Sequence, residues 1–226
     1  TIYKDGKADF LDYREVAPKA AYRDMYLDKE KNVIPHLSTF GILSSGVPGT
    51  VEGMWQAHKK YGSKSWQELL APAISLAENG FIVHPTLAGA VNWRVKSFKN
   101  KNIEVNFSSY FGGLKAGDTF KQPELSSTIK RIATNGSDGF YKGKTADFLV
   151  NYITELGGII THDDLQKYEA IWRKPIEFSY KDYQITSMTL PASGGICLAQ
   201  ILKSMILISI MLFNNLKQIR NNSADH

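Results

Sequence analysis

The sequence contains only one cysteine, Cys197, in a chain of 226 residues. An internal disulfide framework is therefore excluded. Cys197 lies in an apolar stretch, residues 195–199, with no general base in the local sequence, so we expect a buried, unreactive thiol rather than a nucleophile. Because proteins of the cytosol and of the periplasm can both have few cysteines, this count assigns no compartment.

Histidines are few and scattered, which argues against a metal site. No two of them have the spacing of paired ligands on one helix, and no cysteine cluster accompanies them. The five are His36, His58, His84, His162 and His226. We therefore expect no metal and no other cofactor. Asp163 and Asp164 lie in the first turn of an expected helix, where capping explains both carboxylates.

Charge of one sign is nowhere concentrated. The formal net charge is +5, but no run of five or six like charges occurs, and basic residues do not alternate with aromatic ones. We therefore expect no nucleic-acid-binding surface. The loop Gly46-Val47-Pro48-Gly49-Thr50 precedes an expected helix but lacks the Gly-Lys-Ser/Thr ending of a phosphate-binding loop, so we interpret it as a turn.

Long hydrophobic runs are also lacking. The most apolar stretch, residues 205–213, is too short to span a bilayer, and Gln200 and Lys203 interrupt its upstream extension. We expect no membrane span, and instead a buried helix or strand, or a segment whose packing partners are missing. No secretory signal is present, but the first residue is Thr1 rather than Met, and a chain that begins within a strand is expected to be cut from a longer one.

The residues that are present indicate a globular chain, with 43% hydrophobic and 22% charged residues. The patterns predict one α+β domain, helical in its middle and strand-bearing at both ends. We expect strands at residues 1–4 and 8–14, turning at Asp5-Gly6, and a second pair at 171–180 and 184–188. The expected helices cover residues 20–26, 50–61, 65–79, 85–98, 123–135, 144–156 and 161–168, and residues 108–118 are expected to form a loop.

Several helix ends carry specific signals. Ser65-Trp66-Gln67-Glu68 matches a capping box, and Gly80 is suited to end the helix that this box begins. Pro72 should shift or kink that helix. Thr161 is expected to cap the last short helix.

Arg14 is the candidate binding residue. In a strand, Asp12 and Arg14 point to one face, so a structural ion pair is one interpretation. The other interpretation is functional, because a guanidinium is a rigid, permanently charged fork of donors that matches a carboxylate. By contrast, Ser193-Gly194-Gly195 is interpreted as a turn, because the nucleophile elbow needs glycine where Pro191 stands.

Three longer segments follow one another in a specific order. They are Asp12-Tyr13-Arg14-Glu15-Val16-Ala17-Pro18, Ser45-Gly46-Val47-Pro48-Gly49-Thr50-Val51-Glu52-Gly53 and Pro191-Ala192-Ser193-Gly194-Gly195. Between the last two lie Tyr61-Gly62, residues 72–77, Gly80-Phe81, Tyr141-Lys142-Gly143 and residues 157–165. This ordered set resembles the large subunit of the gamma-glutamyltranspeptidase family over nearly the whole chain. Tyr13 stands where phenylalanine is common in the family, and Ala192 replaces a serine.

The resemblance implies a fold and an activity. The fold would be an incomplete αββα four-layer sandwich of the N-terminal-nucleophile hydrolase type, with residues 1–226 forming a partial large-subunit domain. The activity would be transfer of gamma-glutamyl groups from glutathione and other gamma-glutamyl amides to an amino acid, a peptide or water. Arg14 would hold the substrate alpha-carboxylate. The threonine nucleophile would lie outside this chain, in a small subunit cut from the same precursor.

The same resemblance leaves alternatives open. Without the nucleophile and the family's amino-terminal segment, the chain alone is expected to be inactive, and it could be a truncated remnant or pseudoenzyme. Cephalosporin acylases and poly-gamma-glutamate depolymerases share much of the scaffold. The last residues, Asn222-Ser223-Ala224-Asp225-His226, resemble a family segment well before the cleavage point. The resemblance implies a periplasmic or secreted location.

Overall fold

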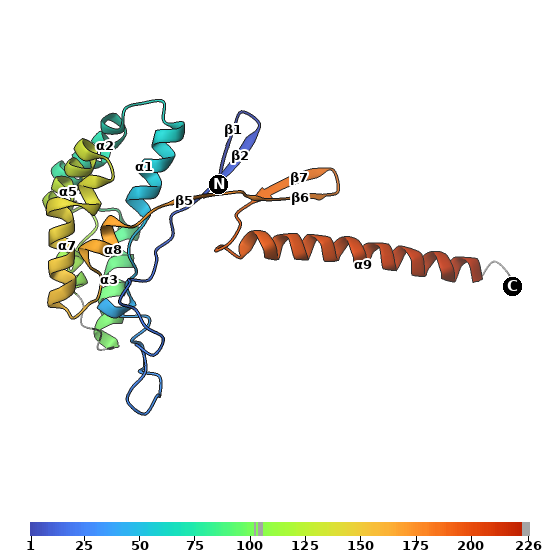
Figure 1. Ribbon diagram of the computed structural model, residues 1–226, viewed down its shortest axis with the longest axis horizontal. Helices are drawn as coiled ribbons and strands as arrows, with labels where there is room; N and C mark the ends of the chain where they lie inside the picture. Colours follow the sequence, from blue (N-terminus) through green and yellow to red (C-terminus); the bar gives the residue numbers. More distant parts are fainter. Residues whose placement is uncertain (102, 104–105, 223–226) are drawn as a thin grey trace. The chain divides into compact units, whose positions relative to one another are not determined.

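The computed structural model describes residues 1–101, 103 and 106–222 (Figure 1). The chain divides into two compact units: a helical unit, residues 13–169, and a terminal unit, made of residues 1–12 together with the segment from Ala170 onward. Helices make up most of the middle of the chain and most strands lie toward its two ends, so the predicted α+β class is confirmed. His226 and most of the C-terminal motif, residues 223–226, lie outside the described residues.

Helices make up most of the helical unit. They are η1 (Ile42–Ser44), α1 (Thr50–Tyr61), α2 (Trp66–Asn79), α3 (Pro85–Asn100), α4 (Phe107–Phe111), α5 (Pro123–Asn135), α6 (Asp138–Tyr141), α7 (Gly143–Glu155) and α8 (His162–Gln166). Strands β3 (Phe81–Ile82) and β4 (Thr119–Phe120) form a short antiparallel pair. Helices α2 and α5 pack side by side, and α5 to α8 each contact the next (Figure 1).

The predicted helix signals of α2 are confirmed. The Ser65 hydroxyl accepts from the Glu68 amide, and the Glu68 carboxylate accepts from the Ser65 amide in return. Gly80 follows the last residue with φ at 87°, a conformation that glycine adopts without a steric penalty. Pro72 lies inside α2 but does not end the helix.

Two local predictions were wrong. Residues 20–26 do not form a helix, because hydrogen bonds between residues three apart close separate turns, as from the Leu27 amide to the Asp24 carbonyl. Within the predicted loop 108–118, helix α4 forms instead. Phe107 and Phe111 are four residues apart and so share one helix face; they contact each other, and Phe107 also contacts Phe98. This aromatic packing outweighs the nearby glycines.

The main hydrophobic core of the helical unit lies among α6, α7, α8 and the loop before α1. Its buried residues are Val47, Tyr141, Ala146, Val150, Ile153, Ile160, Leu165 and Tyr168. The predicted apolar face of the helix at 144–156 contributes Ala146, Val150 and Ile153 to this core. This core therefore fixes the second sequence motif, through Val47, against the C-terminal part of the helical unit.

The terminal unit contains two small sheets. β1 (Ile2–Lys4), β2 (Lys7–Asp12) and β5 (Ile171–Arg173) form one antiparallel sheet, with the predicted turn at Asp5 and Gly6. β6 (Ile176–Tyr180) and β7 (Tyr183–Ser187) form a hairpin around the predicted turn. The single strand predicted at 171–180 is two strands, because Pro175 between them has no amide hydrogen to continue a ladder.

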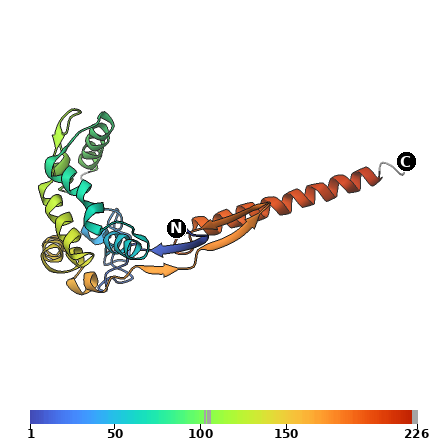
Figure 2. The ribbon, with the colours of Figure 1, turned by 90° about the horizontal axis from the view of Figure 1, so that it is seen from above.

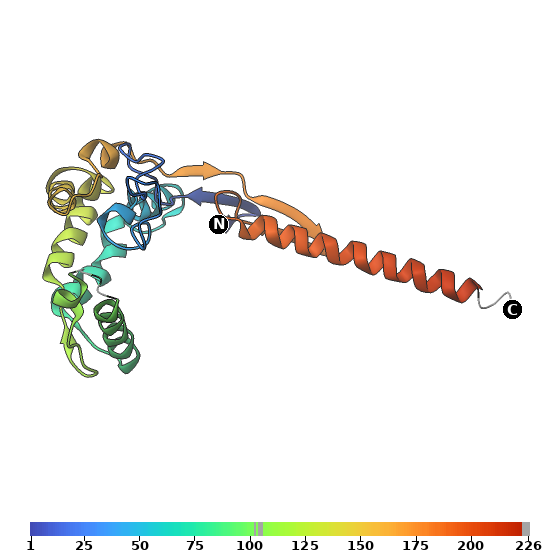
Figure 3. The ribbon, with the colours of Figure 1, turned by 90° about the horizontal axis from the view of Figure 1, so that it is seen from below.

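One long helix, α9 (Gly194–Asn222), completes the described part of the terminal unit. Its first turns contact β6 and β7, and the helix then continues past the hairpin (Figures 2 and 3). Gly195 is buried there, and a side chain at this position would collide with the Met188 carbonyl. Pro191 lies in the turn that precedes α9, which agrees with the turn interpretation of this motif.

The structure corrects the prediction for Cys197, which is exposed rather than buried. Residues 205–213 lie almost entirely on the surface of the described chain, which contradicts the buried alternative for this stretch. The apolar stretch 205–213, which was predicted to be too short to span a bilayer, lies within Gly194–Leu216, a helical segment with the length and composition of a span and with 6% of its most apolar part buried. Length and composition alone do not make a membrane span, because core helices of globular proteins share both.

Candidate functional site

Arg14 lies on an extended segment that follows β2. The predicted strand extended to Arg14, whereas β2 ends at Asp12, whose carboxylate accepts from Arg173 Nε at 2.8 Å. The Arg14 side chain is 63% exposed, and its Nε lies 3.3 Å from Glu15 Oε1. The guanidinium is therefore accessible to a ligand from solvent.

The main chain that follows the Arg14 side chain is tied to distant parts of the helical unit. The Tyr168 hydroxyl donates to the Arg14 carbonyl at 2.9 Å. Two residues later, Val16 and Val47 exchange main-chain hydrogen bonds of 3.3 and 2.8 Å. The first two sequence motifs are thus joined by a β-bridge. The Tyr168 side chain, from the residues that follow α8, holds the first motif as well.

Two glycines of the second motif allow this close approach. A Cβ atom at Gly49 would collide with the Tyr168 hydroxyl and with the Tyr13 carbonyl. A Cβ atom at Gly53 would collide with the Tyr13 ring. Glycine is therefore needed at both positions because the start of α1 lies directly against the Arg14 segment.

Tyr141 supports Tyr168 from the core. Their rings stack with centroids 5.7 Å apart and planes 5° from parallel. The Tyr141 hydroxyl donates to the Pro48 carbonyl at 2.7 Å and accepts from the Glu52 amide at 3.3 Å. Burial raises the pKa of Tyr141 well above its ordinary value, so the phenol stays protonated and keeps its donor.

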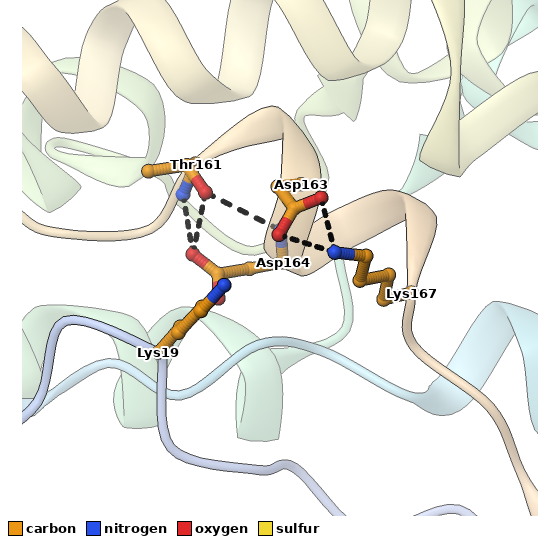
Figure 4. Close-up of polar contacts among 5 residues, drawn as sticks. All are labelled: Lys19, Thr161, Asp163, Asp164 and Lys167. Atoms are coloured by element: carbon orange, nitrogen blue, oxygen red, sulfur yellow. Dashed lines mark hydrogen bonds and ion pairs between the residues drawn. The ribbon is translucent and has the colours of Figure 1, made fainter.

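A second tie joins α8 to Lys19, the residue that follows the first motif; Figure 4 shows the residues involved. The Asp164 carboxylate accepts from the amide and the hydroxyl of Thr161, which completes the predicted helix cap. Its other oxygen accepts from the Lys19 amide at 2.8 Å. Burial acts to raise the pKa of Asp164, but these hydrogen bonds outweigh it and hold the pKa below its ordinary value.

Replacing Asp164 with alanine is expected to lower the free energy of unfolding by about 1–2 kcal/mol at neutral pH, since a helix cap and the Lys19 tie are lost together. Because the folded-state pKa is depressed, this stabilisation is present above the ordinary pKa of 3.8 and is lost as pH falls through the folded value. Urea unfolding of wild type and variant at pH 7 and pH 3 measures both effects.

Asp163 is the matched control. It lies in the same helix turn, but its carboxylate pairs with Lys167 on the surface, at 2.8 Å (Figure 4). Asp163→Ala is expected to change stability by less than about 0.5 kcal/mol. A loss at Asp163 equal to the loss at Asp164 would contradict the tie to Lys19.

An open cavity of about 740 Å³ lies elsewhere in the helical unit. Its lining residues are Gly41, Ile42, Ser45, Ile103, Asn106, Tyr152 and Leu156. These described lining residues carry no charge, so the cavity offers no counter-ion to a carboxylate. This cavity is therefore not the carboxylate-binding site that the exposed Arg14 guanidinium indicates.

The structure brings most of the sequence motifs together in the helical unit. Residues 12–18 and 45–53 meet at the β-bridge, and Tyr141 and Asp164 come from two of the intervening motifs. Sequence reasoning missed Tyr168 and its hydrogen bond to the Arg14 carbonyl. Its only signal was its place at the end of the last predicted helix. The metal prediction is not tested by these contacts, but among the described residues no three His, Cys, Asp or Glu side chains gather as ligands.

The whole chain, residues 1–226, matches the family model of gamma-glutamyltranspeptidase. It is 48% identical over 202 residues to the glutathione hydrolase proenzyme of Pseudomonas aeruginosa, covering 89% of this chain and 36% of that protein. The chain thus spans little more than a third of this relative's length.

Solved structures agree with this match. The gamma-glutamyltranspeptidase from Pseudomonas nitroreducens, complexed with L-DON, has 47% identity and a TM-score of 0.83, covering 88% of this chain and 58% of that one. The Helicobacter pylori gamma-glutamyltranspeptidase has 42% identity, the same TM-score and the same coverage. These are N-terminal-nucleophile hydrolase structures, so the predicted fold type is confirmed. The chain belongs to the gamma-glutamyltranspeptidase family.

Proposed function

We propose that this chain is the substrate-carboxylate-binding part of an enzyme that hydrolyses and transfers gamma-glutamyl groups, with glutathione as a substrate. The observation that carries the proposal is the exposed Arg14 guanidinium on a main chain tied by Tyr168 and Val47. A fixed guanidinium can receive a carboxylate through two parallel hydrogen bonds. Arg14 also stands at the matching position of the motif that carries the family resemblance.

The chemistry places Arg14 at the far end of the substrate. In a gamma-glutamyl amide, three carbon atoms separate the carboxylate carbon from the scissile carbonyl carbon. Holding the carboxylate therefore sets the position of the carbonyl relative to a nucleophile. The nucleophile is proposed to be an amino-terminal threonine of a small subunit from the same precursor, with its own amine as base.

The reaction then proceeds in two balanced steps. The threonine hydroxyl attacks the amide carbonyl and forms an ester, while the amine product leaves with the proton that the threonine amine received. Water or the amine of an acceptor amino acid or peptide next attacks the ester and regenerates the hydroxyl. This chain would bind and orient the substrate in both steps, and by itself it is proposed to be inactive. A periplasmic or secreted location is proposed on the family resemblance.

A substrate panel tests the proposed function in the parent protein, by which we mean the full-length protein proposed to contain this chain. We expect a gamma-glutamyl anilide to be cleaved with a kcat/KM at least about tenfold above that of a glutaryl anilide, which lacks only the alpha-ammonium group. A gamma-linked glutamate polymer is expected to be a poorer substrate still. Preference for the glutaryl compound would indicate an acylase instead, and preference for the polymer a depolymerase.

A further inference from the structure

We propose that Tyr168 is a positioning residue for Arg14. Its hydroxyl would fix the Arg14 peptide plane, so that the guanidinium meets the substrate carboxylate in one orientation. The inference rests on the proposed function of Arg14 and adds a second residue to that site. Tyr168 would not touch the substrate, and its effect on binding would pass through Arg14.

The hydrogen bond from Tyr168 is placed to do this. Tyr168 is only 8% exposed, and its hydroxyl donates to the Arg14 carbonyl at 2.9 Å. This carbonyl belongs to the residue whose side chain is to be oriented. Restraining the peptide plane therefore restrains the direction in which the Arg14 side chain leaves the main chain. That side chain is 63% exposed, and the position of its main chain sets the point from which it reaches a ligand.

The tyrosine is itself held in one place. Its ring stacks on Tyr141, and the Tyr141 hydroxyl donates to the Pro48 carbonyl. Gly49, next to Pro48, leaves no room for a side chain beside the Tyr168 hydroxyl. The stacked pair thus donates two hydrogen bonds, from Tyr168 to the Arg14 carbonyl in the first motif and from Tyr141 to the Pro48 carbonyl in the second. A rigid donor of this kind can set the position of a neighbouring segment, which a flexible surface side chain cannot.

Tyr168→Phe in the parent protein tests the proposal, because it removes the hydroxyl and keeps the ring. We expect KM for a gamma-glutamyl anilide to rise about threefold to tenfold, while kcat changes less than about twofold. Tyr26→Phe is the matched control, since the Tyr26 hydroxyl also donates to a main-chain carbonyl, that of Leu43, at 3.0 Å. This control is expected to leave KM unchanged.

Two further measurements separate positioning from stability. In an Arg14→Ala background, Tyr168→Phe is expected to change KM no further, because its effect passes through Arg14. Hydrogen–deuterium exchange of peptides covering residues 13–18 is expected to speed up in Tyr168→Phe and not in Tyr26→Phe. An unchanged KM in Tyr168→Phe, or an equal rise in KM with and without Arg14, would overturn the proposal.

The proposed function can fail separately. If Arg14→Ala leaves KM unchanged, Arg14 is not the carboxylate anchor, and the assignment of substrate binding is wrong. Exchange at residues 13–18 still decides whether Tyr168 orders the Arg14 main chain. Unchanged exchange in Tyr168→Phe overturns that ordering role whatever the kinetics show.

Discussion

Replacing Arg14 with alanine in the parent protein is expected to raise KM for a gamma-glutamyl anilide about a hundredfold. Each hydrogen bond to a charged group contributes about 1.5–3 kcal/mol, and the variant loses a bidentate pair. Every 1.4 kcal/mol is a factor of ten in affinity. Steady-state kinetics with the anilide measures the change directly.

Substrate analogues make this test specific for the carboxylate. A glutaryl anilide keeps the carboxylate and lacks the ammonium group, whereas a 4-aminobutanoyl anilide keeps the ammonium group and lacks the carboxylate. Arg14→Ala is expected to impair cleavage of the first and to leave the second nearly unchanged, because only the first can bind the guanidinium. Equal losses on both analogues would show that Arg14 supports the fold rather than the substrate.

Arg23 provides a matched control for the loss of an arginine. It is exposed, and its Nε lies 2.7 Å from Asp24 Oδ1, a sequence neighbour, just as Arg14 lies beside Glu15. Arg23→Ala is expected to change KM less than about twofold, because exposed ion pairs contribute little to stability. A hundredfold rise in KM for Arg23→Ala would remove the case for Arg14.

The second large effect is expected in the solution state of the 226-residue chain expressed alone. The apolar surface of α9 should make most of it insoluble or oligomeric, and it should release no glutamate from glutathione. Leu207, Met211 and Phe213 are among the exposed residues of this helix. Replacing all three with glutamine is expected to raise the soluble monomer fraction severalfold, as measured by size-exclusion chromatography with light scattering.

The control replaces three exposed apolar residues of the helical unit, Val33, Leu76 and Trp93, with glutamine. This variant is expected to aggregate as the wild-type chain does, because the long apolar surface of α9 is intact. A monodisperse wild-type chain with a cooperative melt would contradict the prediction. So would glutamate release that Arg14→Ala abolishes.

Local signals in the sequence predicted local structure well. The Ser65 capping box, the Thr161 cap and the turn at Asp5-Gly6 all form as predicted, because each depends on residues within a few positions of one another. α4 was missed because its stability comes from aromatic rings beyond its own sequence, such as Phe98. Residues 205–213, now part of α9, were predicted to form a helix or a strand. Whether such a segment is buried or exposed depends on what packs beside it, and no local sequence pattern records that.

The candidate site was likewise predicted from the sequence only in part. Arg14 could be selected from its motif, but the partner of its carbonyl could not, because Tyr168 lies 154 residues further along the chain. Nothing in a single sequence states which buried phenol will meet which carbonyl. Gly49 was recognisable as part of a turn, and Gly53 as a member of the same sequence motif within the expected helix. That they clear space for Tyr168 and Tyr13 became visible only in three dimensions.

The Tyr141 hydroxyl also has a consequence for how the protein folds. Helix α1 begins after Gly49, and no side chain at this cap position supplies a hydrogen bond to the first turn. The Glu52 amide instead donates to Tyr141, 89 residues later. The start of α1 is therefore completed only when α6 has docked. Closing so long a loop is slow, and we expect the first turn of α1 to order late in folding, after the more local contacts of α5 to α8.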